Sequence, residues 1–261
     1  MAMEHASRLR ALITSRNRER VTCLVAVLVL AIAGNAGVPR PLRAQEAEVG
    51  WEGVAGTGSA YFGLEFPRAL DPHNEILTYM EVNYIYYRTP GATGETRVSS
   101  PGGLTALGLR HTADRWQVEI LPGLEVRRTS EREANGSMER TSEVALAGEV
   151  SLDCEIARDI QAHGDFFHSR VLDYTWARVG VDKGLAGRAS DSTAIGLRLG
   201  PEGTVEISPD LPDLALGLHL EITLPFGAGV IDLRGGVERN NYDAAPRETR
   251  PYVGVEASRD F

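Results

Sequence analysis

The amino-acid sequence predicts an all-β protein, an antiparallel up-and-down transmembrane β-barrel that follows an N-terminal signal peptide. Residues 144–156, VALAGEVSLDCEI, carry the clearest pattern. Side chains alternate across a strand, so Val144, Leu146 and Leu152 fall on one face and the acids fall on the other. The same two-residue period recurs through the chain, an export signal precedes it, and the aromatic Phe261 ends it. Together these observations are typical of an outer-membrane barrel.

The first part of the chain, residues 1–44, has the layout of a secretory signal peptide. A basic stretch precedes the apolar run 21–38, and the segment PRPLRA follows it. We expect cleavage near Ala44 or Ala47, which leaves a barrel at 45–261. The alternative is a retained single-span anchor, but the apolar run is near the lower limit of about 17 residues for crossing a bilayer.

We expect twelve strands, and ten is the alternative count. Residues 115–128 are among the cleanest strands, because Trp116, Val118 and Ile120 alternate with polar residues. The strand at 58–66 runs toward the periplasm, and an exported chain also starts in the periplasm. A strand that runs outward must therefore come first, and the short segment 47–54 supplies it. The first six expected strands are 47–54, 58–66, 76–88, 103–112, 115–128 and 144–156.

The second half of the chain continues the alternation. From Leu214 to Leu224, every second residue is leucine or isoleucine. No heptad or sustained 3.6-residue period occurs after the signal, so the pattern favours strands over helices. The last six expected strands are 159–169, 173–183, 192–207, 213–224, 228–239 and 250–261.

The connections between strands give each strand a direction, because outer-membrane barrels have short periplasmic turns and longer outer loops. We assume that the last strand ends in the periplasm at Phe261. Long connections then lie outside, at 88–103, 129–141, 208–213 and 240–249. Short turns lie in the periplasm, at 112–114, 157–159 and 226–229. The segment 182–192 is an exception, since it is long for a periplasmic turn.

A secreted β-sandwich or lipocalin-like barrel would show the same alternation with its apolar face inward. The expected strands are often ten or more residues long, however, as tilted membrane strands must be. The closing segment RPYVGVEASRDF also resembles the C-terminal strand that the barrel-insertion machinery reads, although Arg259 stands where an apolar residue is usual. We therefore expect the outer membrane as the location, with its lipids and that machinery as partners.

Charge and cysteine content exclude other classes. The signal contains seven arginines and two glutamates, so residues 45–261 keep 20 basic and 34 acidic residues and a net charge of −14. Such a chain repels nucleic acid, which we exclude as a partner. Cys154 is the only cysteine after the signal, so no intramolecular disulfide is expected.

The face assigned to the lumen is crowded with carboxylates and has few bases beside them. A narrow barrel cannot keep so many carboxylates ionised, dry and unpaired. The alternatives are a static network of arginine–carboxylate bridges, protonation of some acids, or a wet cation-favouring pore. The expected lumen residues are Glu81, Arg110, Glu119, Glu125, Arg127, Glu149, Asp153, Glu155, His163, Asp165, Arg178, Asp182, Arg198, Glu202, Glu206, His219, Glu221, Asp232, Arg234, Glu238 and Glu256.

A hydrolase arrangement is geometrically possible but is not expected to be an active site. Ser151, Asp153, His163 and Asp165 face the lumen, and pairing around the following turn brings His163 near Asp153. A lipid-cleaving barrel would need a site that faces the bilayer. The lumen histidines also lack a set of three or four metal ligands, and no nucleotide-binding loop occurs. We expect no enzyme activity, no metal and no cofactor.

The order of several segments resembles a known family. The segments AYFGLEFPRAL, TYMEVNYIYYR, YTWARVGV, RLGPEG and RPYVGVEASRDF are similar to the BcsS family, over nearly the whole chain after the signal. That family is associated with bacterial cellulose biosynthesis. The resemblance implies a non-enzymatic outer-membrane accessory to cellulose or exopolysaccharide synthesis or secretion, with the secretion components as partners. The alternatives are a small cation-favouring or oligosaccharide diffusion channel and an outer-membrane lipid or ester hydrolase.

Overall fold

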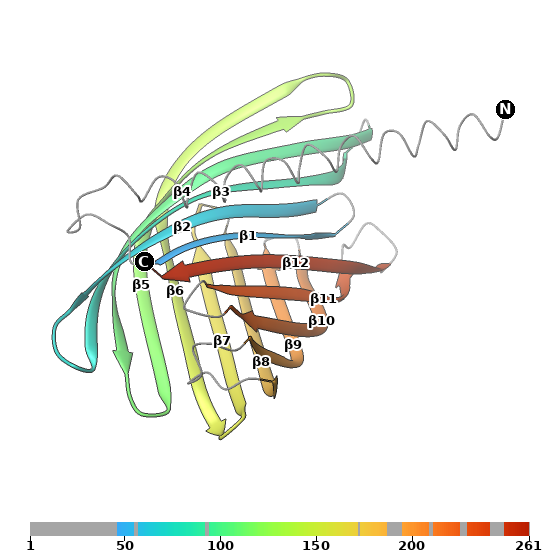
Figure 1. Cartoon of the computed structure of the whole chain (residues 1–261). Helices are drawn as coiled ribbons and strands as arrows, with labels where there is room; N and C mark the ends of the chain where they lie inside the picture. The colour runs from blue at the N-terminus through green and yellow to red at the C-terminus, as the bar shows by residue number, and fades with distance from the viewer. Residues whose placement is uncertain are drawn as a thin grey trace. The chain divides into compact units, whose positions relative to one another are not determined.

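The computed structural model describes residues 46–54, 57–91, 94–171, 173–186, 195–208, 211–224, 229–240 and 248–260. The signal peptide expected at 1–44 and the terminal Phe261 lie outside these ranges. The described residues form twelve antiparallel strands that close into a barrel, which confirms the predicted fold class and strand count (Figure 1). Within the same ranges, no helix has the length and apolarity needed to cross a membrane.

Each strand pairs with its neighbours in the sequence, and β1 pairs with β12 to close the ring. Glu46 stands opposite Asp260, so both ends of the described chain lie at one end of the barrel. Closure removes the free sheet edges that an open sheet would present. The strands are β1 (Glu46–Val54), β2 (Thr57–Ala69), β3 (Asn74–Gly91), β4 (Gly94–Thr112), β5 (Trp116–Arg132), β6 (Met138–Ala157), β7 (Ile160–Ser169), β8 (Tyr174–Ala186), β9 (Gly196–Ser208), β10 (Leu211–Thr223), β11 (Val230–Asn240) and β12 (Glu248–Asp260).

The outer face of the wall is apolar and exposed. A protein that folds in water does not usually leave such a continuous apolar surface uncovered, whereas a barrel in a bilayer must present one to lipid. The alternating pattern of β3, β5, β6 and β10 supplies much of this surface. Its members include Met80, Val82, Leu107, Leu109, Ile120, Leu124, Val126, Leu146, Leu152, Val179, Leu216, Leu218 and Val253.

The predicted outer loops at 88–103 and 129–141 are wrong, because most of these residues are strand. Pairing in the β3–β4 hairpin continues to Gly91 opposite Gly94, and in the β5–β6 hairpin to Arg132 opposite Met138. The start of β6 is exposed on both faces, and the yellow-green β5–β6 hairpin extends past its neighbours (Figure 1). A hairpin surrounded by water needs no apolar face, so its polar sequence resembles that of a loop.

One side of the inner wall holds a small apolar core, which the sequence pattern did not indicate. Leu77, Leu104 and Leu121 are buried inside β3, β4 and β5. Tyr79, Ala106 and Ala147 complete this cluster, and Phe167 packs against it. Side chains therefore fill the lumen along β3 to β7, and charged residues lie on both sides of it.

Arginine substitutions in β10 test the assignment of its outer face to lipid. Leu218 is 57% exposed near the middle of the strand, whereas Leu214 lies nearer its end. An arginine at the bilayer midplane costs about 2–4 kcal/mol, and one near the interface about 0–1 kcal/mol. We expect Leu218→Arg to lower the free energy of unfolding by the larger amount and Leu214→Arg by the smaller. Urea titration in lipid vesicles measures both free energies of unfolding, with the folded and unfolded barrel distinguished by their gel mobility. Equal small effects of the two substitutions would contradict the assignment.

Candidate functional site in the lumen

The structure places the predicted lumen residues on the inner side of the wall with one exception. All of them except Glu155 are buried or half-buried, and they alternate with the exposed apolar residues of the same strands. Glu155 is exposed near the end of β6, where the pairing with β7 shifts register between Glu155 and Ala157. This irregularity ends the regular inward alternation at that position.

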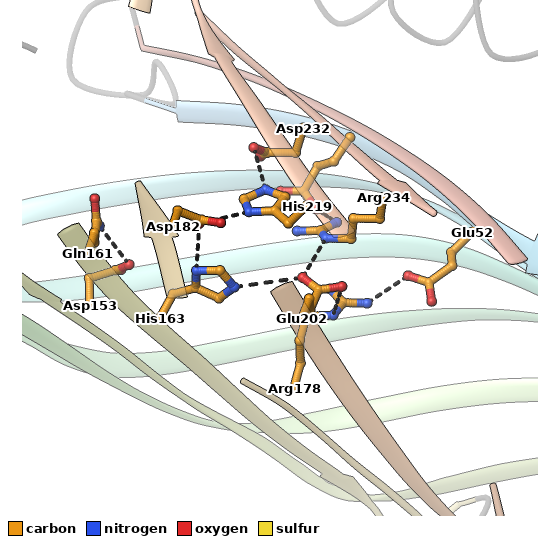
Figure 2. A network of polar contacts seen from close by, with 11 residues as sticks. Glu52, Asp153, Gln161, His163, Arg178, Asp182, Glu202, His219, Asp232 and Arg234 are labelled. Atoms are coloured by element: carbon orange, nitrogen blue, oxygen red, sulfur yellow. Dashed lines mark hydrogen bonds and ion pairs between the residues drawn. The ribbon is translucent and has the colours of Figure 1, made fainter. Parts of the chain in front are cut away.

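Glu202 on β9 lies at the centre of a charged cluster (Figure 2). Its Oε1 is 3.7 Å from Arg178 Nε, and its Oε2 is 3.4 Å from Arg234 Nε and 3.7 Å from His163 Nε2. The residue is only 3% exposed. A carboxylate with so little water contact needs nearby cations, and two guanidinium groups from β8 and β11 supply them.

The two arginines connect Glu202 to distant parts of the wall. Arg178 Nη2 on β8 donates to Glu52 Oε2 on β1 at 2.6 Å. These strands are five places apart in the ring of twelve, so the ion pair crosses the lumen. Arg234 Nη1 donates to Glu256 Oε2 on β12 at 3.0 Å. Glu52, Glu202 and Glu256 are therefore linked through two shared cations.

Beside this cluster, two histidines converge on one carboxylate. Nδ1 of His163 lies 3.1 Å from Asp182 Oδ2, and Nδ1 of His219 lies 2.9 Å from the same oxygen. The opposite nitrogen of His219, Nε2, lies 3.0 Å from Asp232 Oδ1. The two rings meet edge to face with their centroids 5.1 Å apart. His163 and Asp182 lie on the paired strands β7 and β8, His219 and Asp232 lie on the paired strands β10 and β11, and the contact between His219 and Asp182 reaches across β9.

Two glycines make room for this group of residues. A Cβ at Gly180 would lie 2.2 Å from His163 Nε2, and a Cβ at Gly200 would lie 1.8 Å from the Val181 carbonyl oxygen and 2.6 Å from Asp182 Oδ1. No side chain fits at such distances, so the close approach of the ring and the carboxylate to the wall requires glycine at both positions.

A second arginine cluster lies toward the end of the barrel that carries both chain ends. Arg110 on β4 contacts three carboxylates: Glu65 at 2.6 Å, Glu75 at 3.2 Å and Glu119 at 2.5 Å. One guanidinium thus joins β2, β3, β4 and β5.

A third cluster surrounds Arg127 on β5. Arg127 donates to the Glu125 carboxylate, to the Ser100 carbonyl oxygen at 2.9 Å and to Asn83 Oδ1 at 2.7 Å. The Ser169 hydroxyl donates to the same Glu125. Both charged side chains are almost fully buried, so this cluster also closes part of the lumen.

The hydrolase arrangement considered from the sequence does not form. The ladder places Asp153 opposite His163 and Ser151 opposite Asp165. The His163 ring nitrogens, however, lie nearest Asp182 and Glu202, and Asp153 accepts from Gln161 Nε2 at 3.1 Å (Figure 2). His163 is therefore not turned toward Ser151 as a general base would be.

The sequence reasoning missed the acids of the first two strands. Glu52 and Glu65 contact the lumen arginines, and Glu48 accepts from the Tyr79 hydroxyl. The same hydroxyl lies 2.9 Å from Glu81 Oε2. A two-residue period of glutamates is present in EAEVGWEGV, but the short length of this segment obscured it.

No protein-family model matches this chain, and no curated protein matches it. Its fold is similar to several solved structures. The transport unit of the autotransporter AIDA-I from Escherichia coli has a TM-score of 0.53 at 7% identity, over 89% of this chain and 96% of that one. The translocator domain of the autotransporter NalP from Neisseria meningitidis has a TM-score of 0.52 at 11% identity, over 96% and 98%. The β domain of the Bordetella autotransporter BrkA has a TM-score of 0.50 at 12% identity, over 83% and 98%.

At these identities the similarity establishes the fold alone. That fold is the barrel of outer-membrane proteins, and the exposed apolar outer face agrees with it. The chain is therefore an outer-membrane β-barrel, as the sequence predicted.

Removal of the cation shared by Glu52 and Glu202 tests the central cluster. Breaking a buried ion pair by removing one partner costs about 3–5 kcal/mol, and the partial exposure of Glu52 places this pair at the lower end. We expect Arg178→Ala to lower the free energy of unfolding by about 3 kcal/mol in urea titrations. Arg158→Ala is the matched control, because Arg158 is exposed in the β6–β7 turn. Similar stabilities of the two variants would show that the bridge contributes little.

Proposed function

We propose that this protein is a non-enzymatic accessory to bacterial cellulose or exopolysaccharide synthesis or secretion, and that its barrel is a closed scaffold and not the conduit for the polymer. The observation that carries the closed scaffold is the ion pair between Arg178 and Glu52, which crosses the lumen at 2.6 Å. The assignment to polysaccharide secretion is supported by the resemblance of five segments to the BcsS family.

A polymer chain in this lumen would have to displace its side chains. The core formed by Leu77, Leu104 and Leu121 occupies one side, and the Glu202 cluster occupies the other. Each buried ion pair that opened without a replacement partner would cost about 3–5 kcal/mol. These costs favour a barrel that supports or contacts a secretion assembly over one that conducts the polymer.

The β5–β6 hairpin is a suitable contact surface for such an assembly. Its residues 131–143 are exposed on both faces and carry charges of both signs. Mixed charge on an exposed paired hairpin gives orientation and specificity to a protein contact without destabilising the barrel wall.

A strain that lacks the gene tests the accessory role. We expect less cell-associated cellulose, measured by a cellulose-binding dye and by glucose released with cellulase. The wild-type gene should restore it. A gene that encodes a variant with a two-residue turn in place of residues 131–139 should produce a folded barrel but should not restore the cellulose. Normal cellulose in the deletion strain would refute the proposal.

Conductance measurements separate the scaffold from the channel alternative. In planar lipid bilayers we expect the wild-type barrel to show no stable steps, because the bridges close its lumen. The triple variant Glu52→Ala, Arg178→Ala, Arg234→Ala should increase step frequency if it folds, which heat-dependent gel migration verifies. Stable wild-type steps that select cations in a salt gradient would instead favour a small cation channel lined by the lumen acids.

A further inference from the structure

We infer that His163, Asp182 and His219 form a binding site for a divalent transition-metal ion, with Zn²⁺ the best fit, which ties β7, β8 and β10 together inside the barrel. One ligand atom from each of the three residues lies within 4.8 Å of the others. Two imidazoles and one carboxylate are a donor set that zinc prefers, while magnesium and calcium favour oxygen donors alone. The inference is independent of the role in polysaccharide secretion.

The two distances from Asp182 Oδ2 to the histidine nitrogens suit a small tetrahedral ion. Zinc bonds of about 2.0–2.1 Å place neighbouring ligand atoms about 3.3 Å apart. The two contacts of Asp182 Oδ2, at 2.9 Å and 3.1 Å, are close to that separation. Small outward movements of the three side chains would admit the ion, and at least one coordination position would remain for a solvent molecule or for Asp182 Oδ1.

The outer contact of His219 matches the surroundings of a metal-binding histidine. A histidine that binds a metal through one nitrogen usually donates its other N–H to a carboxylate. Here Nε2 of His219 lies 3.0 Å from Asp232, within hydrogen-bond distance, whereas Nε2 of His163 lies 3.7 Å from Glu202, which is too long for a hydrogen bond. Asp232 favours a proton on Nε2 of His219, which leaves the Nδ1 lone pair of that ring directed toward Asp182.

An Nδ1 lone pair and a carboxylate oxygen cannot face one another without a proton or a cation between them. The two contacts of Asp182 Oδ2 therefore need either a proton on each Nδ1 or a single divalent ion in place of those protons. Asp182 is 3% exposed, and its Oδ1 has no hydrogen-bond partner among the described residues. A buried oxygen without a partner is costly, and a bound ion or its solvent ligand would satisfy it.

Metal content of the purified barrel tests the site. The full chain is expressed for export without a polyhistidine tag, extracted in detergent, stripped with a chelator and equilibrated with limiting ZnCl₂. After desalting, elemental analysis should find one zinc per chain. We expect His163→Ala and His219→Ala to weaken zinc binding by more than about 100-fold, and Asp232→Asn, which removes an outer carboxylate, by about 10–100-fold.

The matched control is His168→Ala, because His168 lies on β7 with His163 but contacts Thr175 instead of the cluster. This variant should keep full zinc binding, as should His73→Ala. Cobalt(II) gives a second reading, since bound Co²⁺ should show the strong visible absorption of four-coordinate cobalt only while His163 is present. If an alanine variant fails to fold, Asp232→Asn and the cobalt spectrum of the wild type decide the question. No retained zinc in the wild type, or zinc unaffected by the His163 and His219 changes, would overturn the site.

Discussion

The carboxylates of the inner wall cannot be buried without cations, and the arrangement of the lumen follows from this constraint. Closure of the twelve-strand wall turns one face of every strand inward, where water is scarce. Inward arginines are fewer than inward acids, so some of the arginines are shared between carboxylates. Arg110 contacts three carboxylates, and Arg178 and Arg234 share Glu202. This sharing joins strands that are far apart in the ring, and it makes the lumen a packed interior.

The two sides of the lumen meet the constraint in different ways. Strands β3 to β6 have 17 to 20 residues, and with β7 they enclose the apolar cluster around Leu77 and Leu121. Strands β7 to β12 have 10 to 13 residues, and they carry most of the cluster around Glu202. Apolar burial stabilises part of the long side without cations, although Arg110 on β4 and Arg127 on β5 also pair with acids there. The long strands also continue past the wall as water-exposed hairpins.

The alternation of single residues was enough to predict the strands and their inward acids, because it depends only on the two-residue period of a strand. It could not predict which inward residues meet. His163 and His219 are 56 positions apart in the chain and three strands apart in the ring, and their meeting depends on barrel stagger. The same limit explains the missed partners Glu52 and Glu65, whose arginines lie on distant strands. The exposed hairpins were missed because pairing in water leaves no apolar alternation to detect.

Glu202 and Asp182 show why the kind of cation matters as well as its number. Both are almost fully buried, but arginine guanidinium groups surround Glu202 and imidazole rings surround Asp182. A guanidinium keeps its charge, so Arg178 and Arg234 neutralise Glu202 without a further cation, although neither Glu202 oxygen has a hydrogen-bond partner among the described residues. An imidazole can be neutral, and then it offers a lone pair beside the carboxylate. A cluster that only neutralised the acid would keep its positive charge more reliably with arginine at the positions of both histidines. The use of two histidines at Asp182, with Asp232 behind His219, provides lone pairs that an incoming cation can share.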